Sequence, residues 1–306
     1  MNNSKVLITG ATGFVGRSVL PFLTARGFMV VGAGRSPFQH EGAKHICIGN
    51  IDGHTDWKGA LEGVEVVIHL AARAHQMGET RDELHLYKEI NFEGTVNLAR
   101  QSVLAGVRKF IFISSIKAMI SDAHAEPLTE SFSCNPLEPY GISKLMAERE
   151  LINIAGSTGM RVVILRPPLI YGPGVKGNME SLIGLVKRFP VLPLAGIENR
   201  RSLLGVKNLA SAIETAVVSE RADGKTFLVT DGEEISTSEL VRRLASVFNP
   251  SCRLVRLPQW LWHWAEKVPF LASRVMKLSG SLPVDSSYFT RVTGWKAPYS
   301  MLEQLK

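Results

Sequence analysis

Cysteine is scarce in this chain of 306 residues, and its three copies lie far apart. Cys47, Cys134 and Cys252 form no Cys-x-x-Cys pair, so the pattern indicates neither a zinc site nor a disulfide framework. The eight histidines show no ligand spacing, and no metal site is predicted. Scarce, unpaired cysteine is typical of a protein in the reducing cytoplasm.

Long apolar runs and dense basic runs are absent as well. No uncharged stretch is long enough to cross a bilayer, and the polar residues before Val6 do not resemble a signal peptide, so we expect a cytoplasmic protein. The formal net charge is +7, but lysine and arginine are scattered and not interleaved with aromatic residues. This pattern argues against nucleic acid as a partner and remains compatible with a ligand that carries phosphate.

The first half of the chain alternates short apolar runs with amphipathic segments. Several runs are apolar on both faces, which is typical of strands in a parallel sheet covered by helices on both sides. Right-handed crossovers then predict a doubly wound α/β sheet of the Rossmann type. The predicted strands are 6–9, 29–33, 46–48, 64–70, 110–114 and 162–165; the predicted helices run up to Leu23 and over 55–61, 91–105 and 140–155.

Beyond Pro167, proline and glycine punctuate the chain and the elements become shorter. Helices are predicted over 206–219 and 238–248, the second with a capping box in which Ser236 and Glu239 satisfy free amides. We therefore expect a Rossmann domain over residues 1–166 and a smaller C-terminal α/β domain over residues 167–306. This division leaves room for segments of the second domain to return to the first.

A glycine-rich turn, Thr9-Gly10-Ala11-Thr12-Gly13-Phe14-Val15-Gly16, joins the first strand to the first helix. One glycine permits the tight turn, another lets backbone approach a pyrophosphate, and the third lets helix and strand pack closely. Free N–H groups at the helix start attract the phosphates. This position predicts that the first domain binds a dinucleotide and leaves the second domain for the substrate.

The end of the second strand bears on which dinucleotide binds. NAD sites usually place a carboxylate there for the adenosine ribose, but this chain has Arg35 and Ser36 instead. An arginine beside a hydroxyl suits a 2′-phosphate, which a guanidinium can bind bidentately. NADP(H) is therefore the preferred cofactor, with NAD(H) as the alternative.

Tyr140 and Lys144 lie four residues apart in a helix that begins at Pro139, so they share one face. A nearby ammonium favours a phenolate and lowers the pKa of the tyrosine toward that of a working general base. Ser115, at the end of the fifth strand, is placed to hydrogen-bond the same substrate oxygen. The three residues predict proton exchange with a hydroxyl or keto group.

These motifs resemble the extended short-chain dehydrogenase/reductases, in particular the NAD-dependent epimerase/dehydratase group that acts on nucleotide sugars. The turn at 9–16, His69-Leu70-Ala71-Ala72, the Ser115–Tyr140–Lys144 trio, Tyr171-Gly172-Pro173-Gly174 and Gly294-Trp295 carry the resemblance. It implies catalysis by Ser115, Tyr140 and Lys144, and substrate contacts from Ser115, Asn178 and Arg201. It also implies a homodimer. The implied cofactor contacts are Gly10, Thr12, Gly13, Phe14, Val15, Gly16, Arg35, Ser36, Asn50, Ile51, Leu70, Ala71, Ala72, Asn91, Tyr140, Lys144 and Pro167.

The chain also departs from the pattern of the group. Leu169 stands where many members carry a nucleotide-contacting asparagine, and Lys207-Asn208 replaces a more usual x-Asp. The stretch Ser114-Ser115-Ile116-Lys117-Ala118 lacks the Val-Tyr-Gly ending of typical 4-epimerases. It looks more like a subgroup from bacterial surface-polysaccharide pathways that contains C4 epimerases and 4-ketosugar reductases.

The resemblance implies hydride transfer at C4 of a nucleotide-activated hexose, with UDP as the expected nucleotide. Arg35 favours a 4-ketosugar reductase, because NADPH is commonly an exchangeable reductant, and a UDP-sugar 4-epimerase is the alternative. A non-catalytic NADP-binding regulator is a more remote one, against which the intact trio argues. The tryptophan-rich segment 257–278 is read as packing or a dimer contact, with a membrane-surface helix as the alternative.

Overall fold

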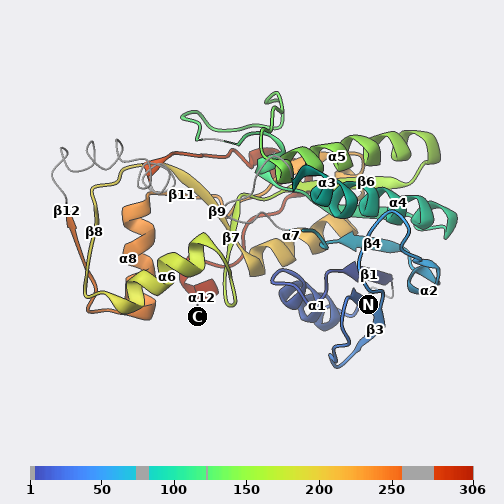
Figure 1. Ribbon diagram of the computed structural model, residues 1–306, viewed down its shortest axis with the longest axis horizontal. Coiled ribbons are helices and arrows are strands. Elements are labelled where there is room, and N and C mark those ends of the chain that lie inside the picture. Colours follow the sequence, from blue (N-terminus) through green and yellow to red (C-terminus); the bar gives the residue numbers. More distant parts are fainter. Residues whose placement is uncertain (1–3, 74–82, 122, 257–278, 306) are drawn as a thin grey trace.

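The computed structural model describes residues 4–73, 83–121, 123–256 and 279–305. Its centre is a seven-stranded parallel sheet with the strand order β10-β6-β5-β4-β1-β2-β3 (Figure 1). This architecture confirms the predicted Rossmann-type α/β class. The strands are β1 (Lys5–Thr9), β2 (Met29–Gly34), β3 (Ala43–Cys47), β4 (Val66–His69), β5 (Lys109–Ile113), β6 (Arg161–Arg166) and β10 (Thr226–Leu228).

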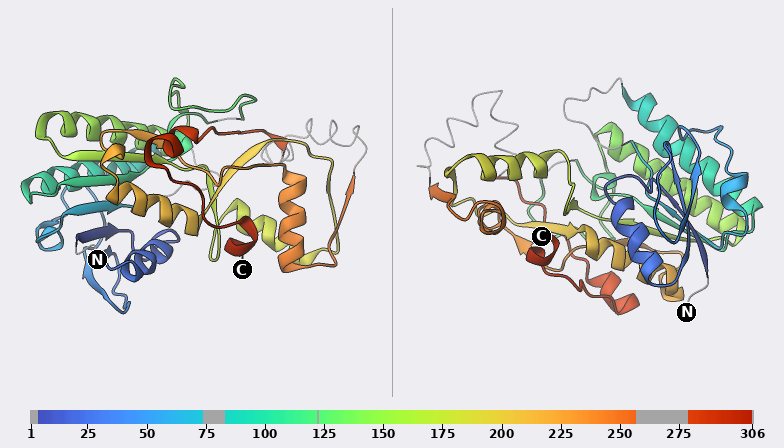
Figure 2. Two further views of the ribbon diagram at one scale, coloured as in Figure 1. Left: turned by 180° about the vertical axis from the view of Figure 1, so that it is seen from behind. Right: turned by 90° about the horizontal axis from the view of Figure 1, so that it is seen from below.

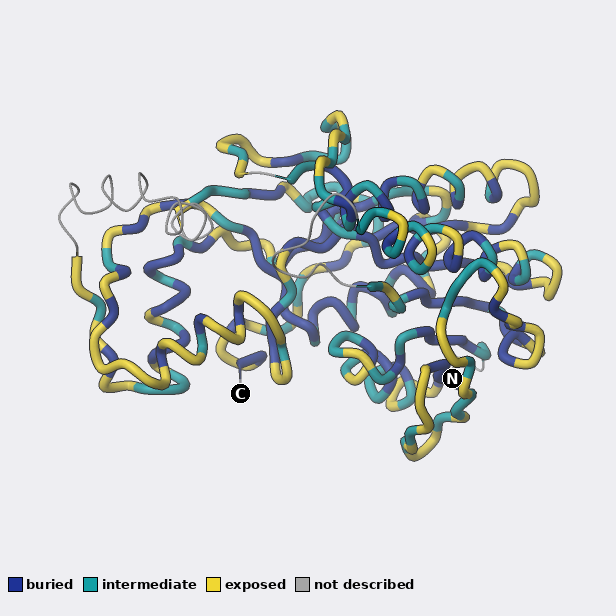
Figure 3. Tube along the Cα trace, viewed as in Figure 1, coloured by how far each residue is buried: buried dark blue, intermediate teal, exposed yellow. Residues whose placement is uncertain are grey.

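Alternate side chains of β1 build hydrophobic cores on opposite faces of the sheet. Val6 and Ile8 join the core under α1 (Gly16–Ala25) and α7 (Val206–Val218), whereas Leu7 joins the core under α4 (Gly94–Leu104) and α5 (Pro139–Thr158). The right-hand view of Figure 2 shows these helix pairs on the two sides of the sheet, and Figure 3 shows its strands buried between them. Burial on both faces explains why the inner strands are largely apolar, whereas the edge strand β3 is only partly buried.

Three predicted element boundaries in the first half differ clearly from the structure. The helix expected over 55–61 is only α2 (Lys58–Leu61), because polar side chains form turns before it. The N–H of Asp52 donates to the hydroxyl of Thr55 at 2.9 Å, and the N–H of Lys58 donates to the carboxylate of Asp56 at 2.9 Å. Such local side-chain bonds compete with helix formation. The third strand begins at Ala43, three residues before the predicted start.

The helix predicted over 91–105 has a different beginning. It is preceded by α3 (Leu84–Tyr87) and a π-helical turn, η2 (Lys88–Glu93), and becomes α-helical as α4 only at Gly94. Segments of π-helix are frequent at functional sites. The turn contains Asn91, which is buried and whose side chain hydrogen-bonds Ser143 in α5.

The C-terminal half contributes a smaller lobe with its own core, at the left of Figure 1. Its two small sheets have the orders β11-β9-β7 and β12-β8. The predicted N-terminal cap of α8 (Thr237–Phe248) is present, because the hydroxyl of Ser236 accepts the N–H of Glu239 at 3.1 Å. The elements are β7 (Leu169–Tyr171), α6 (Asn178–Arg188), β8 (Val191–Ala195), β9 (Arg201–Gly205), β11 (Glu234–Ile235), α8 (Thr237–Phe248), β12 (Arg253–Arg256) and α12 (Met301–Leu305).

Parts of the C-terminal half also belong to the central sheet and its covering layer. Strand β10 pairs with β6, and α7 lies against α1 on the sheet. A turn of 3-10 helix, η4 (Glu220–Ala222), connects α7 to β10, and α11 (Ser287–Thr293) packs beside them. Trp295 follows α11 and is buried against Phe289, with ring centroids 5.4 Å apart.

The tryptophan-rich segment 257–278 lies outside the described residues. Within the described part of the chain, no helix has both the length and the apolar character needed to cross a membrane.

Candidate active site

The predicted cofactor residues follow the carboxyl ends of parallel strands. The glycine turn follows β1, Arg35 and Ser36 follow β2, Asn50 and Ile51 follow β3, Leu70 to Ala72 follow β4, and Pro167 follows β6. Ser115 comes after β5 in the same way. Because all these strands are parallel, the residues gather at one edge of the sheet, where doubly wound folds bind their ligands.

The glycine turn has the close contacts that a dinucleotide cradle requires. Gly10 has φ +67°, and a Cβ there would lie 2.8 Å from the amide nitrogen of Ala71. A Cβ on Gly16 would lie 2.2 Å from the carbonyl oxygen of Gly10, so only glycine lets α1 begin this close to the turn. Gly13 is exposed, with Thr12, Phe14 and Val15 partly buried around it. The turn therefore fits a pyrophosphate, which free N–H groups at the start of α1 would bind.

The residues expected at the adenosine end are accessible. Arg35 and Ser36 are exposed beyond β2, and Asn50 is exposed beyond β3, with Ile51 partly buried next to it. These positions are compatible with cofactor contacts, which stay predictions residue by residue.

Tyr140 and Lys144 lie in the first two turns of α5. Burial raises the pKa of Tyr140 to about 12, and a hydrogen bond with Ser115 partly opposes that rise. Burial lowers the pKa of Lys144 to about 7, with the Glu148 carboxylate acting in the opposite direction. The prediction that Lys144 lowers the pKa of Tyr140 is therefore wrong for this structure, in which that pKa is raised.

The position of the lysine ammonium explains the difference. Its Nζ donates to the carbonyl oxygen of Ile113 at 2.9 Å and lies 4.4 Å from the centre of the Phe112 ring. The charge is thus held by the end of β5.

Ser115 is positioned by a turn of 3-10 helix, η3 (Ile116–Ala118), that packs directly on α5. A Cβ on Gly141 would lie 2.1 Å from the carbonyl oxygen of Lys117, so the glycine after Tyr140 is needed for this contact. The Lys117 ammonium lies 3.2 Å from the Glu138 carboxylate and ties the same turn to the start of α5. Ser115 and Tyr140 are brought together by these contacts, as predicted from their spacing.

Asn91 supports the catalytic helix from η2. Its side chain accepts the N–H of Arg73 at 2.8 Å and donates to the carbonyl of Arg73 at 3.1 Å. The same amide donates to the hydroxyl of Ser143 at 3.1 Å, and that hydroxyl donates to the carbonyl of Tyr140 at 2.8 Å. Asn91 therefore joins the chain after β4 to the first turn of α5. Its role as a direct cofactor contact stays a prediction.

Sequence reasoning missed a buried ion pair below the catalytic residues. Glu148 lies one helical turn after Lys144, and its carboxylate binds Arg166 bidentately, with 2.9 Å between Oε1 and Nε. The four-residue spacing Tyr140–Lys144–Glu148 was the available signal. This pair fixes α5 to the end of β6, just before the chain enters the C-terminal lobe.

The predicted substrate residues of the C-terminal half are placed as follows. Asn178 is exposed at the start of α6, and Arg201 is partly buried on β9, where its Nε donates to the carbonyl of Gly280 at 2.9 Å. Pro167 is buried, and its carbonyl accepts the N–H of Ile116 at 3.0 Å. The roles of all three toward ligands stay predictions.

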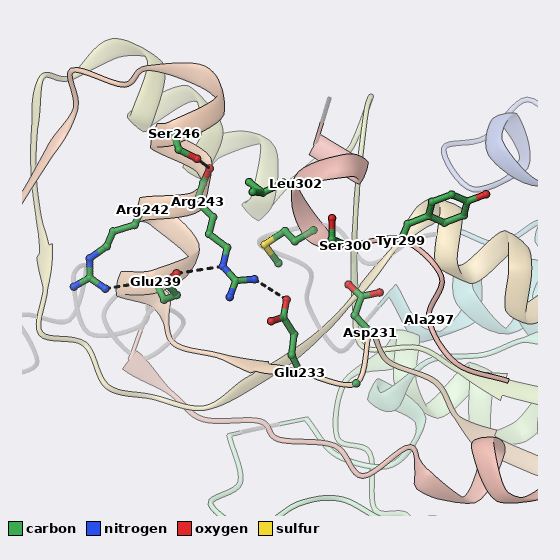
Figure 4. Close-up of a pocket in the computed structure, with 12 residues that line it drawn as sticks. Asp231, Glu233, Glu239, Arg242, Arg243, Ser246, Ala297, Tyr299, Ser300 and Leu302 are labelled. Atoms are coloured by element: carbon green, nitrogen blue, oxygen red, sulfur yellow. Dashed lines mark hydrogen bonds and ion pairs between the residues drawn. The ribbon is translucent and has the colours of Figure 1, made fainter. Parts of the chain in front are cut away.

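A groove of about 740 Å³ in the C-terminal lobe is a separate feature (Figure 4). It lies between α8, α12 and the loop after β10, and the trio does not line it. Four of the five charged side chains that line it pair with one another: Arg243 binds Glu233 at 2.6 Å and Glu239 at 3.2 Å, and Arg242 binds Glu239 at 3.1 Å. The fifth, Asp231, accepts a hydrogen bond from the hydroxyl of Tyr171 at 2.6 Å. None of the predicted site residues lines this groove.

Comparisons with known proteins identify the family of the chain. Residues 6–229 match the model of the NAD dependent epimerase/dehydratase family. A UDP-glucose 4-epimerase of Vibrio cholerae is 38% identical over 306 residues, which cover 99% of this chain and 93% of that protein. The N-acetyl-alpha-D-glucosaminyl-diphospho-ditrans,octacis-undecaprenol 4-epimerase of Escherichia coli O157:H7 is 26% identical over 321 residues, covering 99% and 93%.

Solved structures share the fold. The structure of UDP-glucose 4-epimerase from Thermotoga maritima with UDP-glucose has a TM-score of 0.77 and 22% identity, and the match covers 99% of this chain and 96% of that one. At this identity the likeness supports the architecture alone.

Proposed function

The chain belongs to the NAD-dependent epimerase/dehydratase family and is an enzyme of that family; from this premise we propose that it is a nucleotide-sugar 4-epimerase. The expected substrate is a UDP-hexose, and the expected setting is bacterial surface-polysaccharide synthesis. The observation that carries the proposal is the Ser115–Tyr140–Lys144 trio at the sheet edge beside the glycine turn. The names of the two relatives described above, both 4-epimerases, support the same choice.

The trio supplies orientation and proton transfer at the sugar's O4. Tyr140 has to react as the phenolate, which the positive charge of an oxidised nicotinamide would favour against the opposing effect of burial. The phenolate takes the proton of the 4-hydroxyl as C4 is oxidised, and the phenol returns it to the 4-keto oxygen as C4 is reduced. Ser115 hydrogen-bonds the same oxygen and holds it against the phenol. Lys144, whose pKa lies at about 7, is able to release and regain a proton near neutral pH. A nicotinamide bound at this sheet edge would supply the hydride acceptor and donor for C4.

Inversion needs the sugar to present its other face between the two transfers. Arg201 and Asn178 are the residues we assign to holding the diphosphate while the hexose turns, because a guanidinium and an amide bind phosphate oxygens well. A reductase carries out only the second transfer and consumes its cofactor. Arg35 favoured that activity in the sequence, whereas the relatives favour the epimerase.

The cofactor is a nicotinamide dinucleotide, as the family is NAD-dependent. The exposed Arg35 still supports NADP(H) over NAD(H), since no carboxylate follows β2. An epimerase regenerates its cofactor and can work with either form. Mass spectrometry of the ligand released from purified protein will identify which one the chain retains.

A direct assay tests the proposed activity. UDP-glucose and UDP-N-acetylglucosamine are each incubated with the protein and a catalytic amount of NAD or NADP, and the 4-epimers are resolved by chromatography. We expect interconversion without net cofactor consumption, and loss of it in Tyr140→Phe, which removes the proton-carrying hydroxyl. NADPH consumption with a UDP-4-keto-6-deoxyhexosamine, and no interconversion, would favour the reductase. Unchanged turnover in Tyr140→Phe would revive the regulator alternative.

We also propose a homodimer formed through α4 and α5. Leu104 is 87% exposed and Ile152 is 55% exposed on these helices, and a groove between them is lined by Val103 and Ile154. Light scattering of the purified protein, with Leu104→Glu as the disrupting variant, checks the assembly. For segment 257–278, a membrane-surface contact stays a hypothesis, to be tested by vesicle flotation.

A further inference from the structure

His69 is the last residue of β4, is completely buried, and has a partner on each ring nitrogen. Its Nδ1 lies 2.7 Å from the hydroxyl of Thr9, the residue that opens the glycine turn. Its Nε2 lies 2.9 Å from the hydroxyl of Thr95 in α4. The imidazole thus connects the phosphate-binding turn to the helix that follows Asn91.

The surrounding bonds fix which nitrogen carries the proton. The hydroxyl of Thr95 donates to the carbonyl of Asn91 at 2.7 Å, so it can only accept from His69. Nε2 is therefore the N–H nitrogen, and Nδ1 accepts from the hydroxyl of Thr9. That hydroxyl in turn accepts the N–H of Ala71 at 3.2 Å. The directions run without conflict from Ala71 through Thr9, His69 and Thr95 to Asn91.

The ring is neutral in this setting. Burial lowers the pKa of His69 to about 3, and the positive charge of Lys144 acts in the same direction. The imidazole also stacks on Phe112, with centroids 5.8 Å apart, and the Lys144 ammonium lies against that same phenyl ring. A neutral histidine leaves the lysine as the cation of this cluster.

We propose that His69 is a positioning residue, which as a neutral Nε2–H tautomer holds the cofactor turn in place relative to the catalytic helix. One end of its hydrogen-bond chain fixes the positions of Thr9, which precedes Gly10, and of Ala71, which packs against Gly10. The other end sets the carbonyl of Asn91, whose side chain reaches Tyr140 through Ser143. Hydride transfer depends on the distance between the cofactor, which the glycine turn would hold, and the substrate, which Tyr140 would contact. A misplacement of about 1 Å between them can cost about 100-fold in rate.

The tautomer can be tested without any assay of activity. Long-range ¹H–¹⁵N correlation spectra of the histidine-labelled protein, with His69→Gln used to assign the signal, report the protonation of each ring nitrogen. We expect the neutral Nε2–H pattern for His69 from about pH 5 to about pH 9. An Nδ1–H tautomer, or titration within this range, would overturn the proposal.

Matched variants test the consequence for the site, and their kinetic arm rests on the proposed function. His69→Leu keeps apolar volume and removes both bonds, whereas His69→Gln retains one donor and one acceptor. We expect His69→Leu to lower kcat by about 10- to 100-fold with a smaller change in the sugar KM. We also expect it to weaken NAD(P) binding, measured by fluorescence titration, by about tenfold. His69→Gln should recover part of both losses, and thermal unfolding shows whether each variant is folded.

The outcomes separate the two proposals. A wild-type chain that shows no epimerisation, while cofactor binding falls in His69→Leu and recovers in His69→Gln, contradicts the function and supports the positioning role. Cofactor binding and kcat within about twofold of wild type in a folded His69→Leu would refute the positioning role. Equal defects in the leucine and glutamine variants would do the same, because they would show that the hydrogen bonds do not matter. Thr95→Val, which breaks the chain at the next link, provides an independent check.

Discussion

The ammonium of Lys144 donates to the carbonyl oxygen of Ile113 at 2.9 Å, in a side chain that is almost fully buried. Removing this charge from water is costly, and the cost appears as a pKa of about 7 instead of about 10.4. The native state therefore binds fewer protons than the unfolded state between those two values. By linkage, stability rises with pH through this window, and below about pH 7 the penalty is fully present.

Lys144→Met should accordingly make the protein more stable and inactive. At pH 6 we expect a gain of about 1–3 kcal/mol in the free energy of unfolding, because methionine fills similar space without a charge. The gain should shrink by pH 9, where much of the wild-type lysine is neutral. Thermal or urea unfolding at both pH values checks this. A gain that is equal at pH 6 and pH 9 would show that the charge is not its cause.

Two glycine-to-alanine substitutions should have opposite effects. In Gly16→Ala the new Cβ meets backbone at 2.2 Å, so α1 has to move away from the turn. We expect lower stability and at least tenfold weaker cofactor binding, on the order of 1–3 kcal/mol for each. Gly156→Ala is the matched control, since it lies in α5 with no atom within 4 Å of the new Cβ. It should raise stability by about 0.5–1 kcal/mol and leave cofactor binding unchanged.

Much of the sheet edge could be read from the sequence. Apolar runs identified six of the seven strands of the central sheet and missed the short β10. The glycine turn and the tyrosine–lysine spacing predict ligands at the carboxyl ends of the strands, because these signals are local. The contacts of Lys144 and the bidentate pair of Glu148 and Arg166 could not be read in this way. They join side chains from α5 to β5 and β6, and only the packed fold decides which carbonyl or carboxylate each cation meets.

Predicted helix boundaries were wrong where polar side chains or a π-helical turn change the hydrogen bonding of the backbone. Thr55 and Asp56 shorten α2 by bonding to nearby N–H groups, and the π-helical turn around Asn91 begins before the apolar periodicity does. The groove in the C-terminal lobe left no local signal either, since its lining comes from two separate segments, 231–246 and 297–302. Contacts between side chains far apart in the sequence are thus the part of the structure that could not be predicted.

Lys109 should contribute to stability and not to catalysis. Its buried ammonium donates to the carbonyls of Ala216, Val217 and Ser219 at the end of α7 and lies 2.7 Å from the carboxylate of Asp223. Lys109→Met leaves the three buried carbonyls without this donor, while Asp223 keeps only its pair with Arg161 at 3.1 Å. We expect a loss of about 3 kcal/mol with unchanged cofactor affinity. The neighbour Arg108 pairs with Glu65 at the surface, so Arg108→Met should cost at most about 1 kcal/mol. Similar losses in both variants would contradict this assignment.

Arg35 should decide between the two dinucleotides if the 2′-phosphate is bound at the end of β2. Charge-assisted hydrogen bonds contribute about 1.5–3 kcal/mol, so Arg35→Ala should weaken NADPH binding by about 10- to 100-fold and leave NADH within about threefold. Arg26→Ala is the control, because it removes an equal charge away from the proposed site. Arg26 is exposed at the C-terminal end of α1, where it pairs with Glu214. Calorimetric titration with both cofactors measures the effect. An equal loss for NADH and NADPH would argue against the assignment.

Asn208 stands where the resemblance to the family implies a more usual aspartate. Its amide donates to the carboxylate of Asp231 at 2.6 Å and to the carbonyl of Tyr299 at 2.8 Å, and burial already raises the pKa of Asp231. Asn208→Asp would place a second carboxylate there and raise the pKa values of the pair further. A raised folded pKa means that stability falls as pH rises through it. We expect a loss of about 3 kcal/mol or more at pH 8 and a smaller one at pH 5, by thermal unfolding. Asn208→Ala removes the same bonds without adding charge. Because the Asn208 hydrogen bond lowers the pKa of Asp231, its loss should also be larger at pH 8 than at pH 5, but with a weaker pH dependence than in Asn208→Asp; parallel pH profiles for the two variants would contradict the charge argument.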